Sequence, residues 1–179
     1  MAHLIPFNGH SPRVHPTAFL APTAVLIGQV EVGAHSSIWF GAILRGDHPE
    51  HGIRVGARTS IQDNCVLHVS ARGDTIVEDD VTVGHGAVFE SCTIRRGSLI
   101  GMNSVLLHGC EIGEEALVAA LSVVTTDMKV AARTLVGGVP ARLLKKLEGE
   151  AEDWVRGSAE HYVDLARAYL RQGIGLPTP

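Results

Sequence analysis

Apolar residues recur every six positions along most of this chain. The first series runs from Val14 to Leu44 and the last from Ile94 to Val124, with two shorter series between them. A small residue such as Gly, Ala, Ser, Thr or Cys often stands two or four places after each apolar one. The full set is Val14, Leu20, Leu26, Val32, Ile38, Leu44, Val55, Ile61, Leu67, Val77, Val83, Phe89, Ile94, Ile100, Leu106, Ile112, Val118 and Val124.

A six-residue period predicts an all-β solenoid, in which each hexapeptide is one short strand followed by a turn. Three such strands make one triangular coil of about 18 residues, and neighbouring coils stack about 4.8 Å apart, as strands do in any sheet. A sandwich of short strands is the alternative, but its turns recur every 8–12 residues and do not keep a six-residue phase. We therefore expect a left-handed parallel β-helix of hexapeptide repeats.

The period is interrupted in two places by segments rich in charge, His and Gly. Leu44 and Val55 are eleven residues apart, and Leu67 and Val77 are ten apart, where one repeat needs six. The extra residues belong to the stretches RGDHPEHGIR and HVSARGDT. Such residues favour loops, so we expect both insertions at corners of the solenoid.

The C-terminal part follows a different, helical period. Its apolar residues are spaced by three and four, which is typical of an amphipathic helix. They are Trp154, Val155, Ala159, Tyr162, Leu165, Ala166, Tyr169 and Leu170. We expect residues 1–13 to form a lead-in, 14–140 the β-helix, 141–173 a C-terminal helix packed on it and 174–179 a tail.

Composition narrows the class of protein. The 179 residues carry a net charge of −4 and no basic cluster, so neither nucleic acid nor an anionic membrane is an expected partner. No apolar run is long enough for a signal peptide or a membrane span, which favours a soluble, cytoplasmic protein. The chain has an odd number of cysteines, and they are widely spaced: Cys65, Cys92 and Cys110. We therefore expect them to be buried free thiols.

Polar residues in the middle of the chain fall on one column of the predicted solenoid. Arg45, His68 and Glu90 each follow an inward apolar residue by one place, and one full coil separates each from the next. His85 belongs to the preceding face and should point away from His68 and Glu90 within the same chain. In a homotrimer, however, the face with His85 in one subunit would meet the His68 and Glu90 face of the next.

Two imidazoles and one carboxylate at a subunit boundary would form a metal site with an open position. Each histidine taken alone is also explained as a hydrogen-bonded surface residue. The stacked pair and the residue facing the neighbour favour metal binding only when they are taken together.

Several motifs resemble the γ-class carbonic anhydrase family. They are SSIWFGAILRGD, IQDNCVLHV, VTVGHGAVFESCTI, IGMNSVLLHGCEIG and LVGGVPARLL, followed by AEHYVDLARAYL. The resemblance extends from about Pro12 to Arg171 and implies a left-handed β-helix trimer that hydrates carbon dioxide to bicarbonate. It also implies zinc, or iron in some members, held between subunits by three histidines.

Residue by residue, the resemblance assigns two of the metal ligands to His68 and, from the neighbouring subunit, His85. It matches Arg45 and Asp47 to the family's Arg–Asp pair, which helps to hold the subunits together. Gln62 and Asp63 match the polar pair beside the metal-bound water, and we assign them as catalytic. Gln62 would orient the reacting oxygen, and Asp63 would fix an imidazole or Arg45.

One position departs from the family pattern. Five residues after His85, where a third histidine is usual, this chain has Glu90. A carboxylate can bind zinc, and two histidines with a carboxylate also suit ferrous iron. The added negative charge should raise the pKa of a bound water, so we expect weak or absent hydration. His108 falls one place off the Glu90 column, and we do not expect it to replace the missing imidazole.

Two further questions concern proton transfer and alternative functions. His48 and His51, in the loop after Asp47, are candidate proton shuttles, although solvated loop histidines would look the same. The solenoid also suits a hexapeptide-repeat acyltransferase, but the chain lacks a long lid loop. A non-catalytic trimeric metal-binding module is the other alternative, which Glu90 favours.

Overall fold

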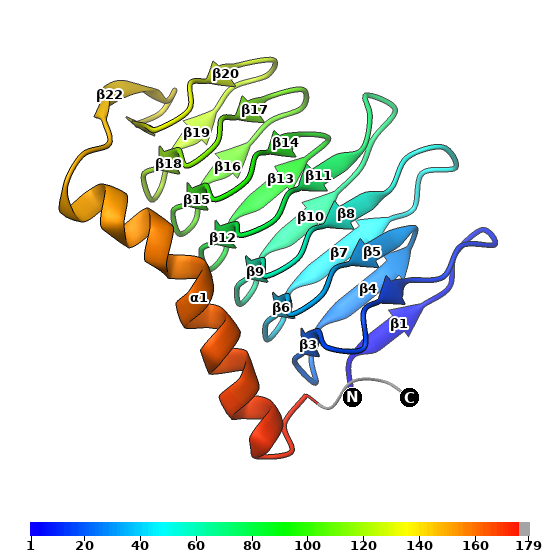
Figure 1. Cartoon of the computed structure of the whole chain (residues 1–179). Coiled ribbons are helices and arrows are strands. Elements are labelled where there is room, and N and C mark those ends of the chain that lie inside the picture. The colour runs from blue at the N-terminus through cyan, green and yellow to red at the C-terminus, as the bar shows by residue number, and fades with distance from the viewer. Residues whose placement is uncertain (176–179) are drawn as a thin grey trace.

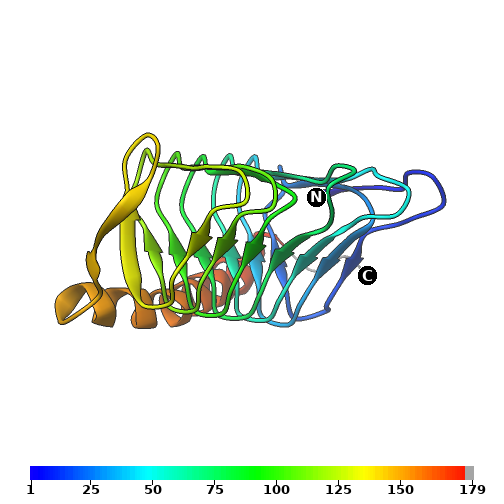
Figure 2. The same cartoon turned by 90° about the horizontal axis from the view of Figure 1, so that it is seen from above.

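The computed structural model confirms the solenoid and describes residues 1–175. Short parallel strands stack into a left-handed β-helix with three sheets, of seven, seven and eight strands, and α1 (Glu150–Arg171) runs along its side (Figures 1 and 2). In the part of the chain that the structure describes, no helix combines the length and apolar character needed to cross a bilayer.

Each sheet takes every third strand of the chain. Sheet 1 contains β1 (His3–Ile5), β4 (Val25–Gly28), β7 (Ile43–Gly46), β10 (Val66–His68), β13 (Val88–Glu90), β16 (Val105–Leu106) and β19 (Val123–Val124). Sheet 2 contains β2 (Arg13–Val14), β5 (Val30–Val32), β8 (Ile53–Val55), β11 (Thr75–Val77), β14 (Thr93–Ile94), β17 (Glu111–Ile112) and β20 (Lys129–Val130). Sheet 3 contains β3 (Phe19–Leu20), β6 (Ser37–Ile38), β9 (Ser60–Ile61), β12 (Thr82–Val83), β15 (Leu99–Ile100), β18 (Leu117–Val118), β21 (Thr134–Gly137) and β22 (Arg142–Lys146).

The six-residue series forms the core. Leu44, Leu67 and Phe89 are paired in register on β7, β10 and β13, and all three are buried. Side chains alternate between the two faces of a strand, so the neighbours of each inward residue point outward. The inward column therefore fixes which polar residues reach the surface of sheet 1.

Both loop insertions lie where the sequence predicts them. The longer one connects β7 to β8 and the other connects β10 to β11, and in each case the strands on either side keep their register. In Figure 2 the loop between β7 and β8 projects beyond the stack. The insertions therefore add surface without disturbing the core.

The predicted segment boundaries need two corrections. β1 lies within the expected lead-in, because His3–Ile5 pairs with Val25–Ile27 and extends sheet 1. β22 lies within the expected helical segment, because Arg142–Lys146 pairs antiparallel with β21. Of the expected tail, residues 176–179 lie outside the described residues.

α1 packs on the outer face of sheet 3 through aromatic residues. The rings of Phe19 and Trp39 lie 4.9 Å apart between centroids, and Tyr169 from α1 meets Trp39 edge-on at 5.2 Å. Trp154 differs from the expected apolar stripe, since 58% of it is exposed. It lines a cavity beside α1 instead of packing into the core.

One corner of the coils requires left-handed backbone. Successive coils place Gly41, Asn64, Gly86, Asn103 and Leu121 there, with φ between 54° and 70°. Gly and Asn tolerate this conformation, but a leucine is strained in it. Burial of the Leu121 side chain offsets little of this strain, because 69% of the residue is exposed.

We therefore expect Leu121→Asn to raise the free energy of unfolding by about 1 kcal/mol, since asparagine adopts left-handed backbone more readily. Urea unfolding at one fixed protein concentration measures it. Leu121→Ala is the control, because it removes the same exposed side chain but keeps the strain. Equal effects of the two substitutions would contradict the explanation.

Candidate metal and catalytic site

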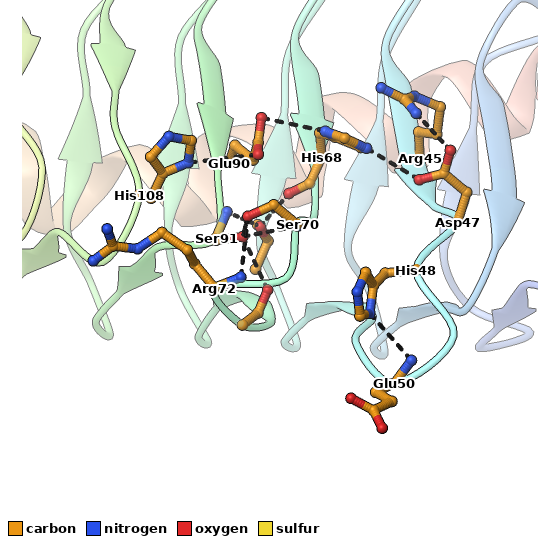
Figure 3. Close-up of polar contacts among 12 residues, drawn as sticks. Arg45, Asp47, His48, Glu50, His68, Ser70, Arg72, Glu90, Ser91 and His108 are labelled. Carbon is orange, nitrogen blue, oxygen red and sulfur yellow. Dashed lines mark hydrogen bonds and ion pairs between the residues drawn. The ribbon is translucent and has the colours of Figure 1, made fainter.

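The parallel register places the predicted site residues of sheet 1 on one column. His68 pairs with Arg45 on β7 and with Glu90 on β13. All three point outward beside the buried residues Leu44, Leu67 and Phe89. The close-up shows the row from Arg45 through Asp47, His68 and Glu90 to His108 (Figure 3).

His68 has a carboxylate on each side. Its Nε2 lies 3.0 Å from Asp47 Oδ1, and its Nδ1 lies 3.3 Å from Glu90 Oε2. Arg45 pairs with the other oxygen of Asp47. Burial acts to raise the pKa of Asp47, but hydrogen bonds from Arg45 and His68 outweigh burial and hold the pKa below its usual value.

This geometry gives the two nitrogens of His68 different roles. A carboxylate only accepts hydrogen bonds, and of the two contacts only the shorter one, to Asp47, has hydrogen-bond geometry, so Nε2–H donates to Asp47 while Nδ1 faces Glu90. Two ligands bound at 2.0–2.1 Å to a tetrahedral zinc ion are about 3.3 Å apart. The separation of His68 Nδ1 and Glu90 Oε2 therefore fits two ligands of one metal ion. The alternative is a direct contact in which Nδ1 carries a proton and faces the carboxylate of Glu90.

His85 lies at the corner after β12, on a different face from His68. Its Nδ1 donates to Asp63 Oδ2 at 2.8 Å, from the corresponding corner after β9. This bond leaves Nε2 as the ring nitrogen with a free lone pair. Orientation of a ligand imidazole by a carboxylate is common in metal sites. Of the two partners expected for Asp63, the structure selects the imidazole.

Gln62, next to Asp63, is only 3% exposed. It lines a cavity beside α1 together with His85 and Tyr162. Burial raises the pKa of Tyr162, the charge of Asp63 adds to this effect, and a hydrogen bond with Gln62 opposes it. Gln62 is thus a buried amide on the same cavity wall as His85, and its catalytic role stays a prediction.

The single chain does not complete the predicted ligand set. No three His, Cys, Asp or Glu side chains among residues 1–175 gather as metal ligands. Whether His85 of another subunit completes the set stays a prediction. Within one chain the structure brings His68 together with Glu90 and Asp47, Asp47 together with Arg45, and His85 together with Asp63.

Two features near this column are not evident from the sequence. His108 Nδ1 lies 3.5 Å from Glu90 Oε1 and is buried with no hydrogen-bond partner. His48 and His51 stack with their ring centroids 4.8 Å apart, and His51 also faces Asp74 at 3.5 Å. These contacts depend on loop and corner conformation, which a six-residue period does not specify.

An aliphatic column runs beside the polar one on the outer face of sheet 1. Its members are partly or largely exposed, and they are Val25, Ile43, Val66, Val88, Val105 and Val123. Contiguous exposed apolar residues commonly mark an interface between proteins. The contacts of His68 with Asp47 and Glu90 therefore lie next to a surface suited to association.

The structure predicts one tautomer for His85. In metal-free protein at a pH where His85 is neutral, we expect its ¹⁵N chemical shifts to report hydrogen on Nδ1, because Asp63 accepts from that atom. Asp63→Ala should abolish this preference. Asp47→Ala is the matched control, since it should alter His68 and leave His85 unchanged; a response of His85 to both would refute the assignment.

Comparisons with known proteins agree with this architecture. Residues 91–126 match the family model described as bacterial transferase hexapeptide (six repeats). The carnitine operon protein CaiE of Proteus sp. is 43% identical over 173 residues, with 97% of this chain and 86% of that protein covered. Gamma carbonic anhydrase 2, mitochondrial, of Arabidopsis thaliana is 39% identical over 168 residues, with 90% of this chain and 60% of that protein covered.

A solved structure is also similar over nearly the whole chain. A presumed acetyltransferase from Bacillus cereus superposes with a TM-score of 0.92 at 37% identity. The superposition covers 96% of this chain and 98% of the other. The Bacillus cereus structure thus shares this fold, and the names of the relatives point to more than one activity.

Proposed function

Because the chain belongs to the hexapeptide-repeat β-helix family that includes CaiE and γ-class carbonic anhydrases, we propose that it is a γ-carbonic anhydrase-like metalloprotein. In this proposal three copies form a homotrimer with a metal ion at each subunit boundary. Carbon dioxide and bicarbonate are the substrates. The metal is zinc, with ferrous iron as the alternative.

The observation that carries the proposal is the pairing of His68 with Glu90. Their facing atoms are 3.3 Å apart, and the opposite nitrogen of His68 is held by Asp47. Asp63 orients His85 in the same way. His68 and Glu90 from one subunit and His85 from the next would supply two nitrogens and one oxygen, a donor set that suits zinc and ferrous iron.

The aliphatic column of sheet 1 supports association. It flanks His68 and Glu90, so a neighbour that covered it would also bring its own residues to the metal ligands. Closed cyclic symmetry repeats the same contact around the ring. The Arg45–Asp47 pair would strengthen this boundary and orient His68 at the same time.

The chain's own residues have distinct roles in hydration. A bound metal ion would act as a Lewis acid and lower the pKa of a water molecule. Gln62 would orient the reacting oxygen through its buried amide, and Asp63 would hold the imidazole of His85. His48 and His51 could carry protons to solvent, because they stack in a projecting loop.

Glu90 is the reason for proposing weak activity. A carboxylate ligand reduces the net positive charge of the metal site, and a water bound there should keep a higher pKa than with three neutral imidazoles. Less hydroxide is then available at neutral pH. If the pKa of the bound water is raised far enough, no hydroxide forms at neutral pH, and the protein would then be a trimeric module that binds the metal without catalysis.

An acyltransferase is the second candidate function. The name of the similar Bacillus cereus structure and the description of the matching family model favour it. The described chain, however, has no long lid loop over a solenoid face. Direct measurement of acyl-coenzyme A binding separates the two candidates.

We also propose a cytoplasmic location. Cys65, Cys92 and Cys110 are free and buried, which agrees with a reducing compartment. Burial raises the pKa of Cys65 to about 12, so this thiol stays protonated and unreactive.

Mixing of two variants tests whether the site lies between subunits. Glu90→Ala and His85→Ala should each lose zinc binding when they are alone. Mixed trimers should recover part of it, because a boundary between His68 and Glu90 of one variant and His85 of the other is intact. Zinc content of the reassembled trimers is the measurement. Full binding by the His85→Ala variant alone would exclude the shared site.

Restoring an imidazole tests the effect of Glu90 on activity. We expect Glu90→His to raise the rate of carbon dioxide hydration at pH 7 by at least about tenfold, because a fall of one unit in the pKa of the water gives tenfold more hydroxide. Stopped-flow measurement with equal zinc content compares the variants. Glu90→Gln is the control that removes the charge without adding a nitrogen ligand, and equal rates for all forms would refute this account of the departure.

A further inference from the structure

We propose that the cavity between α1 and sheet 3 binds an elongated, uncharged aliphatic molecule that carries a carbonyl group. The proposal rests on the single chain alone and does not require a metal ion. It goes beyond carbon dioxide hydration, which needs no cavity for an extended substrate.

The cavity has the size of a small-molecule site. Its volume is about 710 Å³, within the range of pockets that enclose ligands of drug size. Most of its wall is apolar and includes Leu99, Leu117, Leu135 and Met102. The polar residues Gln62 and His85 lie on the wall as well, so the cavity reaches the candidate catalytic residues.

One face of α1 forms the outer wall. Trp154, Gly157, Ser158, His161 and Tyr162 all line the cavity, and their spacing of three and four places them on one side of the helix. A Cβ atom added at Gly157 would meet no atom within 4 Å. Glycine inside a helix is destabilising relative to alanine, so Gly157 keeps the wall open at a cost in helix stability.

A hydroxyl on the inner wall lacks a partner. Ser37, Ser60 and Thr82 occupy successive outward positions of sheet 3. Trp39 Nε1 reaches the first two at 3.0 and 2.9 Å, but Thr82 Oγ1 is buried without any hydrogen bond. Such a group destabilises the fold unless something binds it.

Thr82 lines the cavity. A change of about 120° in χ1, to another staggered rotamer, would bring its hydroxyl to the position now held by its methyl group. The rotated hydroxyl would donate to a ligand carbonyl. The amide of Gln62 offers a second donor on the same wall. The aliphatic part of the ligand would then lie along the leucines under α1.

Charge selects an uncharged ligand. No Asp, Glu, Lys or Arg is among the described residues that line the cavity. Of its two histidines, His85 already donates a hydrogen bond to Asp63, and His161 is exposed to solvent. Moving a carboxylate or an ammonium group into such surroundings without a partner is strongly unfavourable. A neutral amide or ketone meets the available donors without that penalty.

Calorimetric titration of the metal-free, full-length protein with octanamide tests the proposal. We expect binding by the wild type, and a loss of about three- to tenfold in affinity for Thr82→Val, the change expected for one neutral hydrogen bond. Octanoate should bind at least about tenfold more weakly than octanamide. Thr82→Val should also raise the melting temperature without ligand, which shows that its weaker binding does not come from misfolding.

Gly157→Phe and Gly157→Ala form a matched pair. The phenylalanine should fill the cavity and abolish octanamide binding, while the alanine should retain it and stabilise the helix. Absence of binding by the wild type, or unchanged affinity in Thr82→Val, would overturn the proposal. So would a change of oligomeric state with Gly157→Phe alone, because the cavity would then hold part of a second copy. Since metal is absent from every titration, these outcomes are independent of zinc binding at His68 and Glu90.

Discussion

The parallel register between coils is the constraint on which the rest of this structure depends. Each strand is only two to four residues long in most of the solenoid, so one strand alone has little stability. Stability comes from stacking, in which inward leucines, isoleucines and valines of successive coils pack on one another. A shift of one residue would turn every inward side chain outward, and the core therefore holds the register firmly.

The same constraint arranges the chemistry of the surface. His68 has Arg45 below it and Glu90 above it because Leu67 is fixed between Leu44 and Phe89. The polar column is thus a by-product of core packing, and its spacing is that of strands in a sheet. The insertion after β7 adds Asp47, which closes on His68 from the side. The core residues therefore set most of the geometry of the candidate site, and few further residues are needed to position its side chains.

The solenoid and the faces that carry the candidate site residues could be predicted from the sequence, because a fixed period relates residue number directly to position in a solenoid. The count places His68, Glu90 and His85 on the correct faces. It does not specify β22, since an antiparallel return strand breaks the period, or the exposure of Trp154, which depends on how far α1 rolls on sheet 3. Nor does it specify which acceptor holds His85, because Asp63 and His85 both lie in corners.

The cavity beside α1 is another feature that the six-residue period does not predict. Its polar and apolar walls come from sheet 3 and α1, which are far apart in sequence, and no motif joins them. The unpaired hydroxyl of Thr82 becomes apparent only beside Ser37 and Ser60, whose partner Trp39 does not extend to the next coil. Gly157 is visible in the sequence as a glycine inside the predicted helix, but by itself it indicates only that the helix is less stable there.

The antiparallel strand β22 has a consequence for assembly. A stack of nearly identical coils has no inherent length, and a bare parallel edge at its end could accept the first coil of another molecule and grow into a fibre. β22 reverses direction on β21 and occupies that edge on sheet 3. A short return strand thereby covers the last parallel edge of sheet 3, so that this edge cannot accept a strand from another molecule.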